Sequence, residues 1–155
     1  MAEIARRLQE LGIVLPPPPT PRGSYTPVVR HGSYAWVAGQ IALEEGGGVL
    51  RPGLVDRDVP VAEAQTAARR ATLQALSALD HVLGGLDSIA QVVRVTVYVA
   101  SAPGFTRSHE VANGASDLLV EIFGEGGRPA RVAVGVAALP LNAPVEVEIQ
   151  VAISG

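Results

Sequence analysis

The first fifteen residues carry apolar side chains at helical spacing, namely Ile4, Leu8 and Leu11. Gly12 closes this pattern, and four consecutive prolines then impose an extended backbone from Pro16 onward. The spacing predicts a helix within residues 1–15 and a Pro-rich connector behind it. We therefore interpret residues 1–20 as an N-terminal helical extension and residues 21–155 as a single folded domain.

Two further stretches repeat apolar residues three or four positions apart. The first starts at Pro60 and Glu63 and stops at Gly84, and its apolar positions are Ala64, Ala68, Ala71, Ala75, Leu79 and Val82. The second stops at Gly124, and its apolar positions are Val111, Ala115, Leu118 and Ile122. Each pattern predicts an amphipathic helix that buries one stripe of small or branched side chains.

Five other segments are typical of strands, because their apolar residues cluster or alternate with period two. They are residues 25–29, 34–38, 89–100, 131–136 and 145–153. Residues 30–33 predict a hairpin turn between the first two, and the Gly-rich residues 44–53 predict a loop. In the last two strands we assign the valines at every second position to one face. The opposite face then holds Arg131, Ala133, Gly135, Glu146, Glu148 and Gln150.

The predicted order, ββ-α-β-α-ββ, indicates an α+β fold in which one mixed sheet carries two helices on one face. The other sheet face still holds Val, Ala, Gly and Tyr among its polar residues, so it needs a partner. Self-association with cyclic symmetry is the usual way to cover such a face. The pattern leaves the number of subunits open.

Composition narrows the possible chemistry. The chain is 48% hydrophobic and only 4% aromatic, which fits one core of many small side chains. It contains no cysteine, and all twelve basic residues are arginine. These facts exclude thiolate nucleophiles, Cys-ligated metals and Schiff-base lysines. The three histidines, His31, His81 and His109, lack the spacing of a metal site, so we expect no metal.

Charge and hydropathy favour a small-molecule partner. The net charge is -3 and the arginines are dispersed, so we expect no nucleic-acid partner. No stretch approaches the roughly 20 apolar residues of a membrane span. The charged N-terminal residues are unlike a signal peptide. We therefore expect a cytoplasmic protein without a membrane partner.

Arg131 and Glu146, near the starts of the last two predicted strands, are the charged residues that point most directly to a site. With the facing assigned above, both lie on the sheet side that the helices leave open, beside Ala133 and Gly135. A guanidinium binds a carboxylate through two parallel hydrogen bonds, while a glutamate can orient or deprotonate water. A structural ion pair or a solvated strand face is the alternative interpretation.

Several motifs resemble those of one protein family. They are Arg128-Pro129-Ala130-Arg131, Val136-Ala137-Ala138-Leu139-Pro140, Val145-Glu146-Val147-Glu148, Gly39-Gln40-Ile41 and Val111-Ala112-Asn113, together with Tyr25. In these motifs, and from about Tyr25 to the end of the sequence, the chain resembles the RidA/YjgF family, also called the endoribonuclease L-PSP family. Residues 113–119 resemble a bacterial subgroup of that family with a longer N-terminus.

The resemblance implies a chorismate-mutase-like fold and a homotrimer whose sheets form a central barrel. It also implies active clefts between adjacent subunits, where enamines and imines such as 2-aminoacrylate and 2-iminopropanoate are hydrolysed to 2-oxo acids and ammonia. The expected partner is thus a small 2-imino or 2-oxo acid. No metal or organic cofactor is implied.

Residue by residue, the resemblance implies that Arg131 grips the substrate carboxylate and that Glu146 positions the attacking water. Tyr25 and Asn113 line the cleft. Gly39 lets the backbone approach the ligand, because a residue without Cβ permits close contact.

Two residues depart from the family pattern and keep other functions open. Ala38 precedes Gly-Gln, and Ala133 follows the arginine by two residues; both remove polar contacts. A non-catalytic trimer that binds a small metabolite in the same clefts is therefore a second hypothesis. Ribonuclease activity is a third, against which the acidic character and the lack of paired catalytic histidines argue. Arg128 either rims the cleft or is simply solvated.

Overall fold

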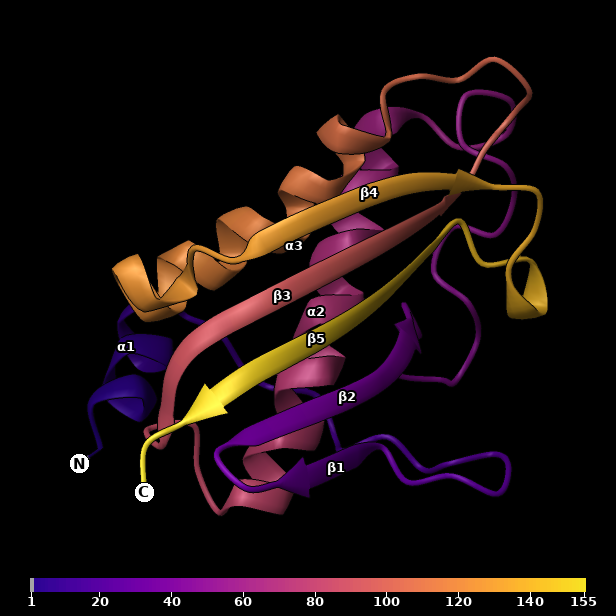
Figure 1. The fold of residues 1–155 in the computed structure, drawn as a ribbon. Coiled ribbons are helices and arrows are strands. Elements are labelled where there is room, and N and C mark those ends of the chain that lie inside the picture. Colours follow the sequence, from indigo (N-terminus) through magenta and orange to yellow (C-terminus); the bar gives the residue numbers. More distant parts are fainter. Residues whose placement is uncertain (1) are drawn as a thin grey trace.

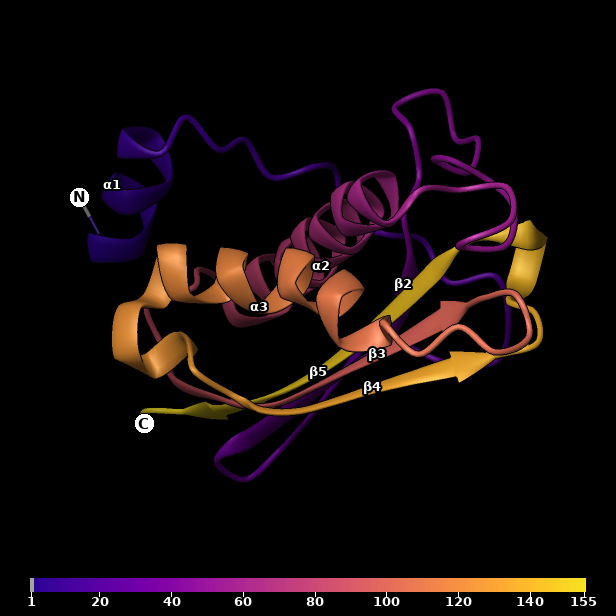
Figure 2. The same ribbon diagram turned by 90° about the horizontal axis from the view of Figure 1, so that it is seen from above.

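A five-stranded mixed sheet forms one layer of the protein, and the helices form the other (Figure 2). The computed structural model describes residues 2–155. The helices are α1 (Glu3–Glu10), α2 (Val61–Leu83) and α3 (Ser108–Phe123), with short 3-10 helices at Gly124–Gly127 and Pro140–Asn142. The strands are β1 (Val28–His31), β2 (Tyr34–Ile41), β3 (Ile89–Ala100), β4 (Ala130–Val136) and β5 (Val145–Ile153). The predicted α+β class, with one mixed sheet and α2 and α3 on one face, is confirmed.

The strand order across the sheet is β1-β2-β5-β3-β4 (Figure 1). β5 lies in the middle and pairs antiparallel with both β2 and β3. β4 pairs only with β3 among the described strands, and this pairing is parallel, with α3 as the crossover between them. β1 and β4 are therefore the two edge strands.

Small side chains fill the space between the sheet and α2. The buried stripe of this helix is made mostly of alanines, and Leu76 and Leu79 are its largest fully buried members. Opposite them, the inward residues of β5 alternate with polar ones, and Val145, Val147 and Val151 are fully buried. The predicted facing of β5 is thus confirmed, and so is the predicted stripe on α2 except at its last position, Val82, which is 45% exposed.

Gly114 marks the point where α3 crosses α2. A Cβ built on this glycine would overlap the backbone carbonyl oxygen of Gln65 on α2 and lie 2.8 Å from its carbonyl carbon. The two backbones approach so closely that only glycine fits without a shift. This contact fixes the position of α3 over the edge of the sheet.

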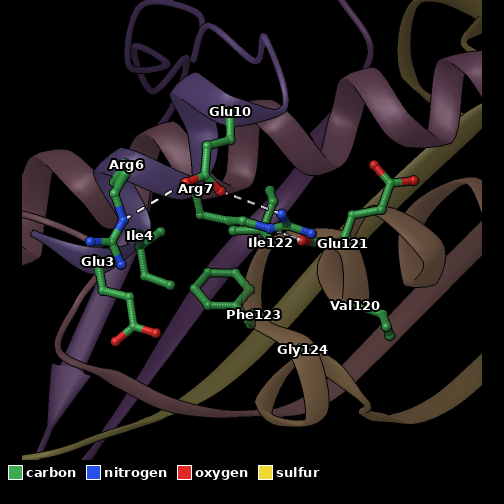
Figure 3. Close-up of a pocket in the computed structure, with 10 residues that line it drawn as sticks. All are labelled: Glu3, Ile4, Arg6, Arg7, Glu10, Val120, Glu121, Ile122, Phe123 and Gly124. Carbon is green, nitrogen blue, oxygen red and sulfur yellow. Dashed lines mark hydrogen bonds and ion pairs between the residues drawn. The ribbon is translucent and has the colours of Figure 1, made fainter.

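The N-terminal extension packs against the helical layer and not against the sheet (Figure 2). The Ile4 amide donates a hydrogen bond to Asp87, and the Ser77 hydroxyl donates one to the Pro16 carbonyl. Between α1 and the end of α3 lies a cleft of about 350 Å³, lined by Ile4, Phe123 and several charged residues (Figure 3). Its arginines are already engaged: Arg7 donates from Nε to the Glu121 carbonyl at 2.9 Å.

The first hairpin differs from its prediction in its bounds. β1 begins at Val28 and continues through His31, so the turn contains only Gly32 and Ser33. The prediction that Tyr25 lies on the first strand is wrong, because Tyr25 occupies a bend before it. The connector with its four prolines, Pro16 to Pro19, precedes Tyr25, and Pro27 follows it by two residues. Because proline cannot donate a backbone hydrogen bond to a neighbouring strand, this segment stays out of the sheet.

The sheet face away from the helices is open and partly apolar. Figure 1 looks onto this face. Its exposed apolar side chains are Val29, Tyr34, Trp36 and Val134, with exposed fractions of 38 to 51%. Within residues 2–155, no helix combines the length and the apolar character that a membrane crossing requires.

Candidate active site

Arg131 lies at the start of the edge strand β4, and its side chain turns toward α3. In the parallel register Arg131 is the partner of Val95, whose side chain is fully buried under the helices. Paired residues of neighbouring strands point to the same side of a sheet. Arg131, Ala133 and Gly135 therefore face the helical layer, and the valines between them face the open side. The predicted facing of β4 is therefore wrong. The facing follows from the parallel pairing of β4 with β3, which the sequence does not show.

Two neutral side chains on α3 hold the guanidinium of Arg131. Its Nη1 donates to Asn113 Oδ1 at 2.6 Å and to Ser116 Oγ at 3.1 Å. Asn113 and Ser116 are three residues apart and so lie on the same face of the helix. No Asp or Glu of residues 2–155 lies within 4.0 Å of this guanidinium. Arg131 is exposed, so its charge remains available to an incoming anion.

Glu146 lies on the open face of the sheet, near the start of the central strand β5. Its neighbours Val145 and Val147 are fully buried on the helical side, so the glutamate points away from the helices, as predicted. Gly39 on β2 lies directly beside it: a Cβ on Gly39 would overlap Glu146 Oε1 and lie 2.9 Å from its Cδ. The register of β2 against β5 shifts between Val37 and Gln40, which places Gly39 in a bulge next to the carboxylate.

The surroundings of Glu146 favour its protonated form. Partial burial raises the pKa of the Glu146 carboxyl, and the neighbouring charge of Glu148 raises this pKa further. Glu148 in turn accepts a hydrogen bond of 2.7 Å from the Tyr98 hydroxyl. This bond, followed by burial, raises the pKa of Tyr98. A carboxylate whose pKa is raised is a stronger base, which suits it to accept a proton from water.

Arg131 and Glu146 are not neighbours within one chain. β3 separates their strands, and Arg131 is level with Val95 whereas Glu146 is level with Tyr98. Two strand spacings and three residues along the strand put their backbones about 14 Å apart. Their side chains also leave opposite faces of the sheet. The expectation that they share the open face of one protomer is therefore wrong.

The remaining predicted site residues divide between these two groups. Asn113 contacts Arg131, and Gly39 contacts Glu146. Tyr25 is 55% exposed in its bend, and its hydroxyl accepts a weak hydrogen bond of 3.4 Å from the Arg22 amide. Ser116 was missed by sequence reasoning, although its position three residues after Asn113 on a predicted helix was a usable signal.

Other candidate charges have structural partners. Arg128 is exposed and forms an ion pair with Glu125, three residues before it, at 3.0 Å. Arg69 pairs with Glu121 and links α2 to α3. Trp36 is 40% exposed on the open face of β2.

Comparison with known proteins gives one consistent family. The model of the family described as endoribonuclease L-PSP matches residues 17–153. Protein TCP17 of Trypanosoma cruzi is 44% identical over 146 residues, covering 94% of this chain and 91% of that protein. A mouse 2-iminobutanoate/2-iminopropanoate deaminase is 32% identical over 132 residues, covering 84% and 82%.

The crystal structure of a protein of unknown function from Agrobacterium tumefaciens superposes with a TM-score of 0.88 at 42% identity, covering 99% of this chain and 93% of that one. Its match to nearly the whole chain includes the α1 extension, which the family model does not cover. On the family model and these identities, the chain belongs to the endoribonuclease L-PSP family, which is the RidA/YjgF family that its motifs resemble.

Proposed function

We propose that the protein hydrolyses small 2-imino acids, such as 2-iminopropanoate, to 2-oxo acids and ammonia in clefts between the subunits of a homotrimer. The observation that carries this proposal is the guanidinium of Arg131. It is exposed, held in place by neutral oxygens of Asn113 and Ser116, and has no acidic partner among residues 2–155. A positioned cation without a counter-ion is suited to bind a carboxylate through paired hydrogen bonds.

The separation of Arg131 from Glu146 supports a site shared by two protomers. Within one chain the two side chains leave opposite faces of the sheet. Arg131 lies on the edge strand β4, where a second protomer can approach, and Glu146 lies on the open apolar face that needs cover. When that face packs against the β4 edge of a neighbour, the two groups meet across the interface. A cyclic trimer repeats this contact three times.

The chemistry asks little of the protein beyond positioning. Arg131 holds the substrate carboxylate, and Glu146 of the neighbouring protomer accepts a proton from water as the oxygen bonds to the imine carbon. The C=N π pair moves to nitrogen, which takes the proton back from Glu146 and gives a carbinolamine. The hydroxyl then passes its proton through Glu146 to nitrogen, its electron pair forms the C=O bond, the C–N bond breaks, and ammonia leaves the 2-oxo acid. The net reaction consumes one water, and orientation of the reactants supplies much of the acceleration.

The proton acceptor in this scheme is the carboxylate form of Glu146. Because burial and Glu148 raise the Glu146 pKa, this form is lost at a higher pH than for an ordinary glutamate. The rate should therefore fall as the pH drops through that raised pKa.

A mixing experiment tests the shared site. Arg131→Ala and Glu146→Gln chains with different affinity tags are co-expressed, and the mixed trimers are assayed for decay of imine supplied by a threonine dehydratase. Each variant alone should be inactive. In each mixed trimer, one of the three interfaces joins an intact Arg131 to an intact Glu146, so mixed trimers isolated with both tags should regain about a third of wild-type activity. Mixed trimers no more active than the single variants would contradict the shared site.

A metabolite-binding trimer without turnover is the second candidate, and Ala133 favours it. This residue shares the face of Arg131 two positions along β4 and offers no polar group to the reacting atoms. Wild-type protein that is stabilised by 2-oxobutanoate but leaves imine decay unchanged would support binding alone. Incubation of the same preparation with RNA tests the ribonuclease hypothesis directly.

A further inference from the structure

The guanidinium of Arg131 has two edges that present parallel N–H donors to a carboxylate. One edge consists of Nε and Nη2, and the other of Nη1 and Nη2. Which edge receives the substrate determines where its imine carbon lies. The contacts of Arg131 with α3 distinguish the two edges, because they all involve Nη1.

Both hydrogens of Nη1 are already used. One goes to Asn113 Oδ1 at 2.6 Å and the other to Ser116 Oγ at 3.1 Å. Nη1 carries only two hydrogens, so none remains for a ligand. Nε and Nη2 make no hydrogen bond to any group of residues 2–155. The edge that they form is the one still free to bind a carboxylate in bidentate fashion.

Ser116 is itself oriented to accept this bond. Its hydroxyl donates to the Ala112 carbonyl, one helical turn back, at 3.3 Å. With the hydroxyl hydrogen engaged there, a lone pair of Oγ points to Arg131. Asn113 must present its oxygen to Nη1, because a guanidinium has no acceptor. Its amide hydrogens therefore turn away from Arg131.

From these contacts we infer that Ser116, with Asn113, is a positioning residue that fixes the arginine so that the carboxylate of a 2-imino or 2-oxo acid binds to Nε and Nη2. This inference rests on the proposed function and deepens it. Holding the arginine in advance removes rotamer freedom that the ligand would otherwise have to restrict. Loss of Ser116 frees one Nη1 hydrogen, so the edge formed by Nη1 and Nη2 can compete for the carboxylate, which then binds end-on. The affinity for the substrate should fall, while the groups that react with it remain in place.

Side-chain NMR of the full-length, ¹⁵N-labelled protein tests the binding edge. The Arg131 Nε–H resonance is assigned by its absence in Arg131→Lys, and 2-oxobutanoate is then titrated. Binding to Nε and Nη2 should shift this resonance until the ligand saturates. A resonance that stays fixed while other signals saturate would overturn the inference, because the carboxylate would then bind end-on.

Ser116 is tested by affinity and by the split between KM and kcat. Ser116→Ala should weaken 2-oxobutanoate binding and raise KM by about tenfold, as for one lost bond to a charged group, with a smaller effect on kcat. Ser116→Thr should restore affinity, since a helical threonine keeps a hydroxyl that bonds to the carbonyl four residues back. The matched control is Thr66→Ala on α2, which also removes a hydroxyl bonded four residues back, to the Ala62 carbonyl, but does not contact Arg131.

The outcomes separate the two levels of the proposal. Turnover by the wild type, with Ser116→Ala indistinguishable from it, would overturn the role of Ser116 and leave the proposed function intact. Wild-type protein that neither binds 2-oxobutanoate nor hydrolyses imines would overturn both. Equal losses in Ser116→Ala and Thr66→Ala would show a general effect on helix stability and would also contradict the positioning role.

Discussion

Gly39 shows how much of the candidate site depends on a missing side chain. The glycine sits in the β2 bulge, and the Glu146 carboxylate occupies the space that a Cβ would fill. Family resemblance predicted that Gly39 lies near the ligand, and the structure brings it against Glu146. The sequence could name this residue because the Gly-Gln-Ile motif is short and contiguous. Ser116 was missed: its spacing from Asn113 places both on one face of a predicted helix, but only the assembled sheet shows that this face meets β4.

A Gly39→Ala substitution should separate activity from stability. The added methyl group displaces the flexible end of Glu146 and not the backbone, so the melting temperature should change little. Moving the carboxylate by about 1 Å should lower kcat on 2-iminobutanoate by about a hundredfold. Gly46→Ala is the control, because a Cβ there meets nothing within 4 Å. A fully active Gly39→Ala enzyme would remove Glu146 from the proposed mechanism.

At the scale of elements, hydrophobic spacing predicted every long helix and strand, and the errors concern how strands pair. The period of α2 and the alternation of β3 and β5 are strong because each runs for many residues. β4 is short and lies at an edge, so both of its faces are partly exposed and its valines do not reveal which side is inside. Its parallel pairing with β3 follows from the α3 crossover. That pairing, and with it the facing of Arg131, is a property of the assembled sheet.

The crossing of α2 and α3 can be tested at Gly114. Helix propensity alone predicts that Gly114→Ala stabilises the protein by about 1 kcal/mol. The overlap with the Gln65 backbone opposes this, since backbone atoms cannot rotate away. We expect a net loss of about 1–3 kcal/mol in the free energy of unfolding, measured by urea denaturation. Gly48→Ala, with open space around the new methyl group, is the control. Stabilisation by Gly114→Ala would contradict the close crossing.

For the whole molecule, the uneven cover of the sheet is the dominant feature. Helices protect one face, whereas the other exposes Tyr34, Trp36 and Val134. The sequence indicated that the helices cover only one face of the sheet, and the structure confirms it. The prediction of three subunits rests only on the family resemblance. The direction in which single residues face does not determine the rotation between neighbouring subunits, and this rotation sets their number.

Trp36→Glu should disrupt the proposed trimer. A charge in the centre of a desolvated interface is costly, so the variant should sediment as a monomer of 16.0 kDa and the wild type at three times that mass. Trp36 is the sole tryptophan, so its emission should also shift to the red when wild-type trimers are diluted until they dissociate. Val82→Glu is the control, since Val82 is similarly exposed but lies on α2. A wild type that sediments at 16.0 kDa would refute the trimer.

The central place of β5 has a consequence for how the chain is made. The β1–β2 hairpin and the β3–α3–β4 unit share no strand pairing, and β5 alone bridges them. Translation delivers residues in order, so both pieces leave the ribosome with an unfilled gap between them until residues 145–153 emerge. During that interval each piece presents a bare strand edge to its surroundings. The nascent protein is therefore most prone to aggregate just before its sheet is complete.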